Sequence, residues 1–250
     1  MAKPSNAAAS RSQKPTPPPS AAKNTYLLAY NALSAALWAG VLYKTITVGS
    51  QEISKAGTGG WIKAGEGPLG AVQKGLASGK VYDELEVYTR MVQSLAGLEV
   101  LHSLFGIVRA PLLTTLMQVS SRFLLVHAIA SPYAFPSTSR PSPAYTTMLL
   151  AWSITEVIRY SYFVFNLSGV GVPKLWTWLR YNTFLVLYPL GVASECWLVY
   201  KAIEPASRIN EVYGYVLYAI LAVYVPGIYV LFTHMLKQRA RLMREARRSL

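Results

Sequence analysis

The chain has 250 residues, of which 52% are hydrophobic and only 14% are charged, and its net charge is +13. The hydrophobic residues gather in long blocks, whereas a soluble domain of this length disperses them. Much of the positive charge lies in the two ends of the chain, so we do not interpret it as a nucleic-acid-binding surface. The single cysteine, Cys196, excludes an intramolecular disulfide and a disulfide-stapled secreted fold. The composition therefore predicts a membrane protein.

The two ends of the chain differ from the part between them. Residues 1–24 are rich in proline, serine, alanine and lysine and lack the apolar run of a cleavable signal peptide, so we expect a disordered tail. A membrane domain then covers residues 25–236. Residues 237–250 form a basic tail, which either attracts anionic lipid head groups or, as we prefer, determines the topology.

Six apolar blocks have lengths that suit membrane-spanning helices, which need about 17 to 25 residues. They cover residues 26–47, 92–108, 112–130, 145–167, 179–200 and 212–236. The second block is short, so a buried or re-entrant helix is its alternative. An even number of crossings, with basic residues in both tails, predicts that both termini are cytosolic.

Ionisable residues inside the apolar blocks must pair with one another or line a wet cavity. Glu156 and Arg159, three residues apart on one helix face, form either a structural pair or part of a site. Glu195 has no basic residue within one turn of its own helix. Its partner is therefore Arg122 or Arg159 from another helix, or Glu195 takes part in chemistry.

Three histidines, His102, His127 and His234, lie far apart in sequence on different blocks. The sequence has no cluster of cysteine and histidine with the spacing of zinc ligands. We therefore expect these histidines to make structural hydrogen bonds, and we propose no metal.

The segment Tyr188-Pro189-Leu190-Gly191-Val192-Ala193-Ser194-Glu195 places a phenol and a carboxyl group in the fifth block. Seven residues rise about 10 Å along a helix with about 20° of angular drift, so both side chains share one face. Tyr188 lies too deep for an interfacial aromatic belt. Pro189 can kink the helix, and Gly191 allows another backbone or a ligand to approach closely. We expect an all-α membrane protein whose six transmembrane helices bundle around an intramembrane active-site pocket.

Five ordered motifs carry a resemblance to a known family. They are Leu98-Glu99-Val100-Leu101-His102 with Gly106, Gln118-Val119-Ser120-Ser121-Arg122, Trp152-Ser153-Ile154-Thr155-Glu156-Val157-Ile158-Arg159-Tyr160, Leu179-Arg180-Tyr181-Asn182, and the Tyr188 to Glu195 segment. With them, residues 82–236 resemble the very-long-chain 3-hydroxyacyl-CoA dehydratases of the endoplasmic reticulum, once named protein tyrosine phosphatase-like proteins. The Gly-rich segment 57–79 lies outside the resemblance. We reject phosphatase activity, because Cys196 is predicted within a helix and not in an anion-binding loop.

The resemblance implies the third step of fatty acid elongation, dehydration of a (3R)-3-hydroxyacyl-CoA to a trans-2-enoyl-CoA, which supplies very long chains and sphingolipid precursors. It implies Tyr188 and Glu195 as the catalytic pair. We expect Glu195 to be the base and Tyr188 the proton donor, because a phenol stays protonated near neutral pH, and the reverse assignment stays open. The expected supporting or substrate-binding residues are Arg122, Glu156, Arg159, Arg180, Tyr181 and Gly191. Among these, Arg180 and Tyr181 are the candidates for contacting the CoA phosphates.

The reaction needs no cofactor besides the CoA thioester of the substrate. The implied partners are the lipid bilayer and the condensing enzyme, ketoacyl-CoA reductase and enoyl-CoA reductase of the elongation cycle. One alternative is a catalytically silent scaffold of the elongation complex, which loss of Tyr188 or Glu195 would favour, but both are present. A transporter is the other alternative, and the sequence has neither an internal repeat nor two matched broken helices to support it.

Overall fold

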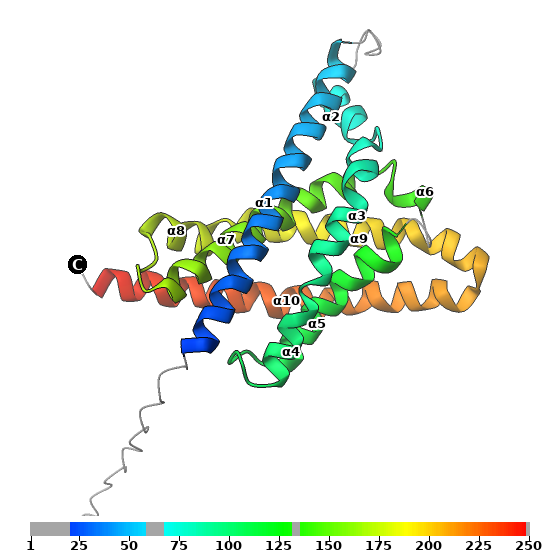
Figure 1. The fold of residues 1–250 in the computed structure, drawn as a ribbon. Coiled ribbons are helices and arrows are strands. Elements are labelled where there is room, and N and C mark those ends of the chain that lie inside the picture. The colour runs from blue at the N-terminus through cyan, green and yellow to red at the C-terminus, as the bar shows by residue number, and fades with distance from the viewer. Residues whose placement is uncertain (1–20, 59–67, 132–135, 249–250) are drawn as a thin grey trace, which may run out of the picture.

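The computed structural model describes residues 21–58, 68–131 and 136–248, and within these ranges the chain is helical (Figure 1). The predicted disordered tail lies almost entirely outside the described residues. In chain order the elements are α1 (Ala21–Thr58), α2 (Pro68–Leu76), α3 (Lys80–Ser94), α4 (Gly97–Leu104), α5 (Leu112–Phe123), the π-helix η1 (Leu124–Ile129), α6 (Pro136–Ser139), α7 (Pro143–Ser168), α8 (Lys174–Asn182), α9 (Phe184–Ile209) and α10 (Glu211–Arg248).

Each predicted apolar block corresponds to helix, but two block boundaries were wrong. The second block, predicted as one helix over residues 92–108, is divided between the end of α3 and the eight-residue α4. The fifth block, predicted over residues 179–200, is divided between the end of α8 and most of α9, which meet at a bend of 43° at residue 183. Pro189 lies inside α9, beyond that bend. In addition, α10 runs through most of the predicted basic tail as a continuous helix.

Helix α7 is the central element, packed against α1 on one side and α9 on another. Pro143 begins it at the first turn, where its missing N–H and fixed φ are favourable, and Gly169 ends it with a φ of 77°. Its side chains Met148 and Leu149 are fully buried, as is Leu198 of α9. The helix that carries the Glu156 and Arg159 motif is therefore covered by its neighbours.

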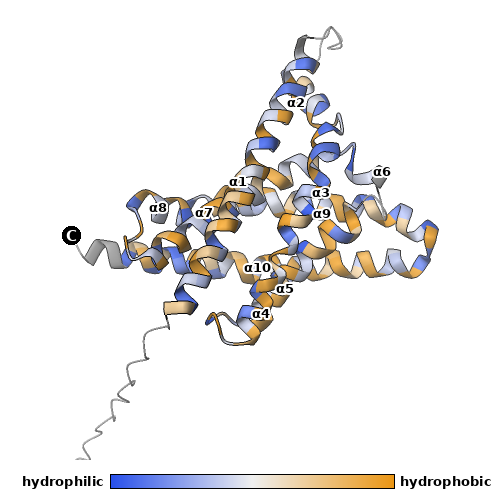
Figure 2. Ribbon diagram, in the orientation of Figure 1, coloured by the Kyte–Doolittle hydropathy of each residue, from blue (hydrophilic) through white to orange (hydrophobic). Residues whose placement is uncertain are grey.

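Hydrophobic residues occupy long stretches of the helices (Figure 2), and many of the large ones are exposed. Within the described ranges, three helices are long and apolar enough to cross a membrane: Ala21–Gly57, Leu112–Ile129 and Glu211–Arg244. The bent pair α8 and α9 makes a fourth if it is counted as one span. Exposed apolar surface of this extent is typical of a surface that faces lipid or another protein. The chain is thus an all-helical protein with helices suited to a membrane.

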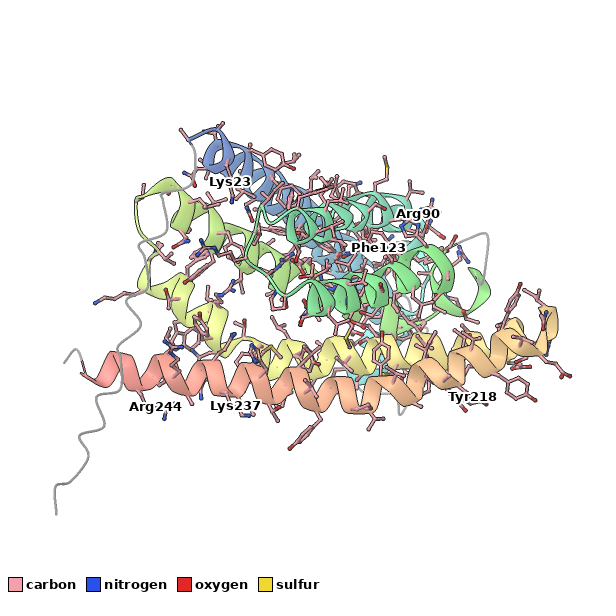
Figure 3. All side chains as sticks on the ribbon, turned by 90° about the horizontal axis from the view of Figure 1, so that it is seen from below. Lys23, Arg90, Phe123, Tyr218, Lys237 and Arg244 are labelled. Carbon is pink, nitrogen blue, oxygen red and sulfur yellow. The ribbon has the colours of Figure 1, made fainter. Side chains whose placement is uncertain are left out.

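The beginning of α1 and the end of α10 lie at the same end of the bundle. Figure 3 shows Lys23, Lys237 and Arg244 toward one end, with Arg90 and Tyr218 toward the other.

Short contacts attach neighbouring helices at the end of the bundle that carries Lys23. The Asn24 amide donates to the Leu167 carbonyl of α7 at 3.1 Å. The Arg239 guanidinium of α10 donates two hydrogen bonds, of 3.0 and 3.1 Å, to Asn182 Oδ1 of α8. These bonds fix α1 to α7 and α10 to α8.

At the opposite end, an ion pair joins α3 to the segment that precedes α7. Arg140 donates from Nε and Nη2 to the two carboxylate oxygens of Asp83, each at 2.7 Å. Because both side chains are partly exposed, solvent screens this pair.

The Gly-rich segment contains α2, which packs closely against the last turns of α1. A Cβ atom added at Gly75 would lie 2.5 Å from Ile53 Cα and 2.6 Å from its backbone nitrogen, so the backbones themselves would have to move. We expect Gly75→Ala to destabilise the protein by about 1–3 kcal/mol, seen as a lower thermal unfolding midpoint in detergent. Gly57→Ala is the matched control, since its Cβ would meet nothing within 4 Å. Equal unfolding midpoints for the two variants would contradict this packing.

Candidate active site

Helices α9 and α10 form an antiparallel hairpin that carries Tyr188 and Glu195. Asn210 begins α10 as its cap, because its Oδ1 accepts the Val212 N–H at 2.9 Å. Further along, the Tyr188 ring stacks on Phe232 with centroids 5.8 Å apart and planes inclined by 17°. The Glu195 carboxylate accepts a hydrogen bond from α10 as well. Both side chains therefore point to the side of α9 that faces α10, as their seven-residue spacing predicts.

Glu195 is buried, and two neutral groups hold its carboxyl group. Trp152 Nε1 of α7 donates to Oε1 at 2.7 Å, and the Tyr224 hydroxyl of α10 donates to Oε2 at 3.0 Å. The sequence left Arg122 and Arg159 as candidate partners, and neither arginine makes a described hydrogen bond to Glu195. Arg122 instead places its guanidinium 5.1 Å from the centroid of the Trp152 ring. Neither arginine binds Glu195 because both bind Glu156 instead.

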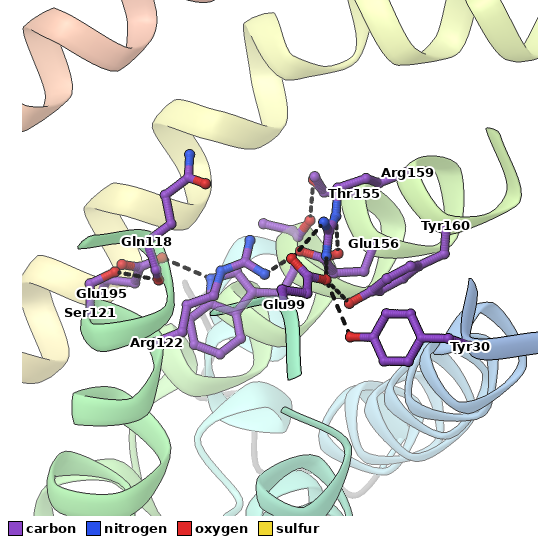
Figure 4. Close-up of polar contacts among 12 residues, drawn as sticks. Tyr30, Glu99, Gln118, Ser121, Arg122, Thr155, Glu156, Arg159, Tyr160 and Glu195 are labelled. Atoms are coloured by element: carbon purple, nitrogen blue, oxygen red, sulfur yellow. Dashed lines mark hydrogen bonds and ion pairs between the residues drawn. The ribbon is translucent and has the colours of Figure 1, made fainter. Parts of the chain in front are cut away.

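Glu156 on α7 is the centre of a buried charge network (Figure 4). Its side chain is only 2% exposed, and it accepts hydrogen bonds from Arg122 Nη1 and, at 2.6 Å, from Arg159 Nε. The predicted pair of Glu156 and Arg159 is confirmed, and Arg122 of α5 joins it. Two guanidinium groups and one carboxylate carry a net charge of +1, so a second carboxylate is needed to neutralise the group.

That second carboxylate is Glu99 of α4. Arg159 donates to both of its oxygens, from Nη2 at 2.7 Å and from Nη1 at 3.0 Å, in the bidentate geometry that suits a guanidinium. The Tyr160 hydroxyl donates to Glu99 Oε1 at 2.5 Å, and Tyr30 of α1 reaches the same oxygen at 3.5 Å. The network thus connects α1, α4, α5 and α7 beside the helix that carries Glu195.

Gly191 lies where α9 meets α7. A Cβ atom at this position would lie 3.5 Å from Ala151 Cβ and 3.9 Å from Trp152 Cδ1, an ordinary van der Waals distance. The neighbouring atoms at Gly191 therefore belong to α7, at a distance that would also admit a Cβ atom. Helix α7 brings Trp152 within reach of Glu195.

Arg180 and Tyr181 lie on α8, before the bend that leads into α9. The Arg180 guanidinium lies over the rings of Tyr162 and Phe163, 4.4 and 5.0 Å from their centroids, and 5.9 Å from that of Tyr181. None of its described contacts is with Tyr188 or Glu195. Arg180 is thus held by aromatic rings at the end of the bundle where Arg239 binds α8.

The three histidines make the structural hydrogen bonds that the sequence predicts. The Tyr26 hydroxyl lies 2.8 Å from His102 Nε2, Ser94 Oγ lies 3.1 Å from His127 Nε2, and Gln238 Nε2 lies 2.8 Å from His234 Nε2. In the part of the chain that the structure describes, no group of three or more His, Cys, Asp or Glu side chains is placed to hold a metal ion.

One cavity lies away from the predicted catalytic pair. It is bounded by the start of α7 and the second half of α9, with Ser142, Trp197, Lys201 and Arg208 among its lining residues, and neither Tyr188 nor Glu195 lines it. The Tyr188 hydroxyl has no described hydrogen bond within residues 21–58, 68–131 and 136–248.

Two groups that contact Glu195 were not predicted from the sequence. Trp152 begins one of the quoted motifs, but an indole carries no charge that marks it as a partner. Tyr224 is one of 17 tyrosines, so its type gives no signal. An antiparallel pairing of α9 and α10 is the signal that could have indicated Tyr224. In such a pairing, the register that brings Tyr188 to Phe232 also brings Glu195 close to Tyr224.

Comparison with known proteins identifies the family. Residues 93–245 match the family model described as protein tyrosine phosphatase-like protein, PTPLA. The chain is 38% identical over 224 residues to a probable very-long-chain (3R)-3-hydroxyacyl-CoA dehydratase of Schizosaccharomyces pombe, covering 90% of this chain and 95% of the relative. It is 35% identical to the Arabidopsis thaliana dehydratase PASTICCINO 2, covering 92% of this chain and 97% of that protein. No solved structure matches the chain. The resemblance inferred from the five motifs is confirmed, and the chain belongs to the protein tyrosine phosphatase-like family.

Proposed function

We propose that this protein dehydrates very-long-chain (3R)-3-hydroxyacyl-CoA to trans-2-enoyl-CoA, the reaction for which its curated relatives are named. The observation that carries the proposal is a buried carboxyl group, Glu195, on the same helix face as Tyr188. Both groups suit acid–base chemistry, and the reaction needs one proton acceptor and one donor.

The proton balance assigns one role to each residue. Glu195 takes the proton from C2, the electron pair forms the double bond to C3, and the C3–O bond breaks. Tyr188 donates its proton to the departing hydroxyl, which leaves as water. Return of the proton from Glu195 to Tyr188 completes the cycle, so the step uses no oxidant, reductant or cofactor. The two Cα atoms are about 10 Å apart along a regular helix, which leaves room for C2 and C3 between the side chains.

The membrane provides the site for the acyl chain. We propose six crossings, made by α1, by α3 with α4, by α5 with η1, by α7, by α8 with α9, and by α10, around an intramembrane substrate site. Each CH₂ group kept out of water contributes about 0.8 kcal/mol, so a very long chain stays in an apolar environment. The anionic CoA head then lies at the end of the bundle that carries Arg180 and Tyr181.

The cellular setting follows from the same proposal. The basic residues at the start of α1 and at the end of α10 support, by the positive-inside rule, the proposal that both termini are cytosolic. The proposed membrane is that of the endoplasmic reticulum. The condensing enzyme and the two reductases of the elongation cycle would supply the substrate and consume the product. A silent scaffold is disfavoured, since it has no need for a buried Glu195 held by two donors.

The test uses the full-length protein purified in detergent. Given a (3R)-3-hydroxyacyl-CoA with a very long chain, it should form the 2-enoyl product without added nicotinamide, flavin or metal ion. The (3S) enantiomer serves as the control substrate, and we expect it to react much more slowly. A well-folded protein that produces no enoyl-CoA would contradict the proposal and favour the scaffold.

A further inference from the structure

Tyr224 differs from the other tyrosines of α10 in the direction that it faces. Four of them, Tyr213, Tyr215, Tyr218 and Tyr229, are between 51% and 72% exposed on the apolar exterior. Tyr224 instead turns into the bundle and is partly buried. Its hydroxyl donates a hydrogen bond to Glu195 Oε2 at 3.0 Å.

The carboxyl group of Glu195 accepts hydrogen bonds from two different helices. Trp152 on α7 donates to Oε1 at 2.7 Å, while Tyr224 on α10 donates to Oε2. One donor would leave the carboxyl plane free to turn about its last bond. Two donors on different helices fix that plane. Each carboxylate oxygen keeps a second lone pair, so the group can still accept a proton.

Neutral hydrogen-bond donors such as Trp152 and Tyr224 suit a carboxylate that must accept a proton. A buried carboxylate without hydrogen bonds is costly, so some donor must satisfy it. Direct pairing with a guanidinium would make the carboxylate a weaker proton acceptor, and both nearby arginines are held by Glu156 instead. A phenol and an indole stabilise the carboxylate without neutralising it.

We propose that Tyr224 is a positioning residue for Glu195, fixing the orientation of the carboxyl group with which Glu195 accepts the C2 proton. The inference rests on the proposed function and adds to it a residue of α10. Tyr224 acts through Glu195 and not through substrate. Its removal should therefore affect the chemical step more than binding.

Tyr224→Phe is the direct test, since it removes the hydroxyl and keeps the ring. We expect kcat to fall roughly 10- to 100-fold, the range for losing a hydrogen bond to a charged group, with KM nearly unchanged. Because Trp152 still donates to Glu195 Oε1, the thermal unfolding midpoint should fall only slightly and the variant should stay folded. Tyr229→Phe is the matched control on the same helix, with its ring 72% exposed, and it should retain wild-type kcat.

Infrared spectroscopy gives a second measurement that does not depend on turnover. The band of the Glu195 carboxyl group is assigned by its loss in Glu195→Gln. It should shift in Tyr224→Phe and stay in place in Tyr229→Phe, because only the first variant removes a hydrogen bond to that group.

The outcomes separate this inference from the proposed function. If wild type is active and Glu195→Gln is not, while Tyr224→Phe keeps wild-type kcat, the positioning role is overturned and the dehydratase stands. A loss of kcat with an unshifted carboxyl band, or with a loss of folded protein, would likewise overturn it in favour of a structural role. An inactive, well-folded wild type would overturn both.

Discussion

Glu195→Gln is expected to lower kcat for dehydration by about 10²- to 10⁴-fold, the usual contribution of a general base. Glutamine has nearly the same shape and can still accept one hydrogen bond from Trp152 or Tyr224, but its amide cannot take the C2 proton. Folding should be retained. The measurement is single-turnover formation of enoyl-CoA by the purified variant, with its elution from a sizing column as the check on folding.

Tyr188→Phe is expected to cause a loss of the same order, because it removes the proton donor to the leaving hydroxyl. The ring keeps its stacking on Phe232, so the hairpin of α9 and α10 should be unaffected. Tyr200→Phe is a matched control on the same helix, since the Tyr200 side chain is 53% exposed on the outside of the bundle.

The pair of variants can contradict the assignment in two ways. Wild-type turnover by either variant would remove that residue from the chemistry. If Tyr200→Phe lost as much activity as Tyr188→Phe, the loss would reflect a general sensitivity of α9 to tyrosine removal. Only a loss confined to Tyr188 and Glu195 supports them as the catalytic pair.

Glu156→Ala should have the largest effect on stability among the substitutions considered. It leaves the partly buried guanidinium groups of Arg122 and Arg159 without the carboxylate that they share. Breaking a buried ion pair from one side costs about 3–5 kcal/mol, because a charge is left uncompensated. We expect a large fall in the unfolding midpoint in detergent, and a loss of folded protein on extraction from the membrane.

The control for this prediction is an exposed ion pair. Glu204 and Arg208 lie four residues apart on α9 with side chains 76% and 78% exposed, so Glu204→Ala should change stability by no more than about 1 kcal/mol. If Glu156→Ala were as stable as Glu204→Ala, the network around Glu156 would not hold the helices together.

Much of the fold could be predicted because membrane helices are encoded by local composition. The length and apolarity of a block such as residues 145–167 predict α7 to within a few residues. The break between α3 and α4 was missed, because the apolar run continues across residues 95 and 96 and gives no sign that the helix is interrupted. The bend at residue 183 was missed for a similar reason, since Pro189 is the more conspicuous signal.

The helical fold with helices suited to a membrane, the shared helix face of Tyr188 and Glu195, and the family could all be predicted from composition and spacing along the chain. The partners of the buried carboxylates could not. They depend on the tertiary structure, in which Glu195 binds Trp152 and Tyr224 while Arg122 and Arg159 bind Glu156. Three of these contacts join residues 29 to 43 positions apart, on different helices. Whether they form depends on how each helix is rotated and shifted against its neighbours, which hydropathy and local spacing leave open.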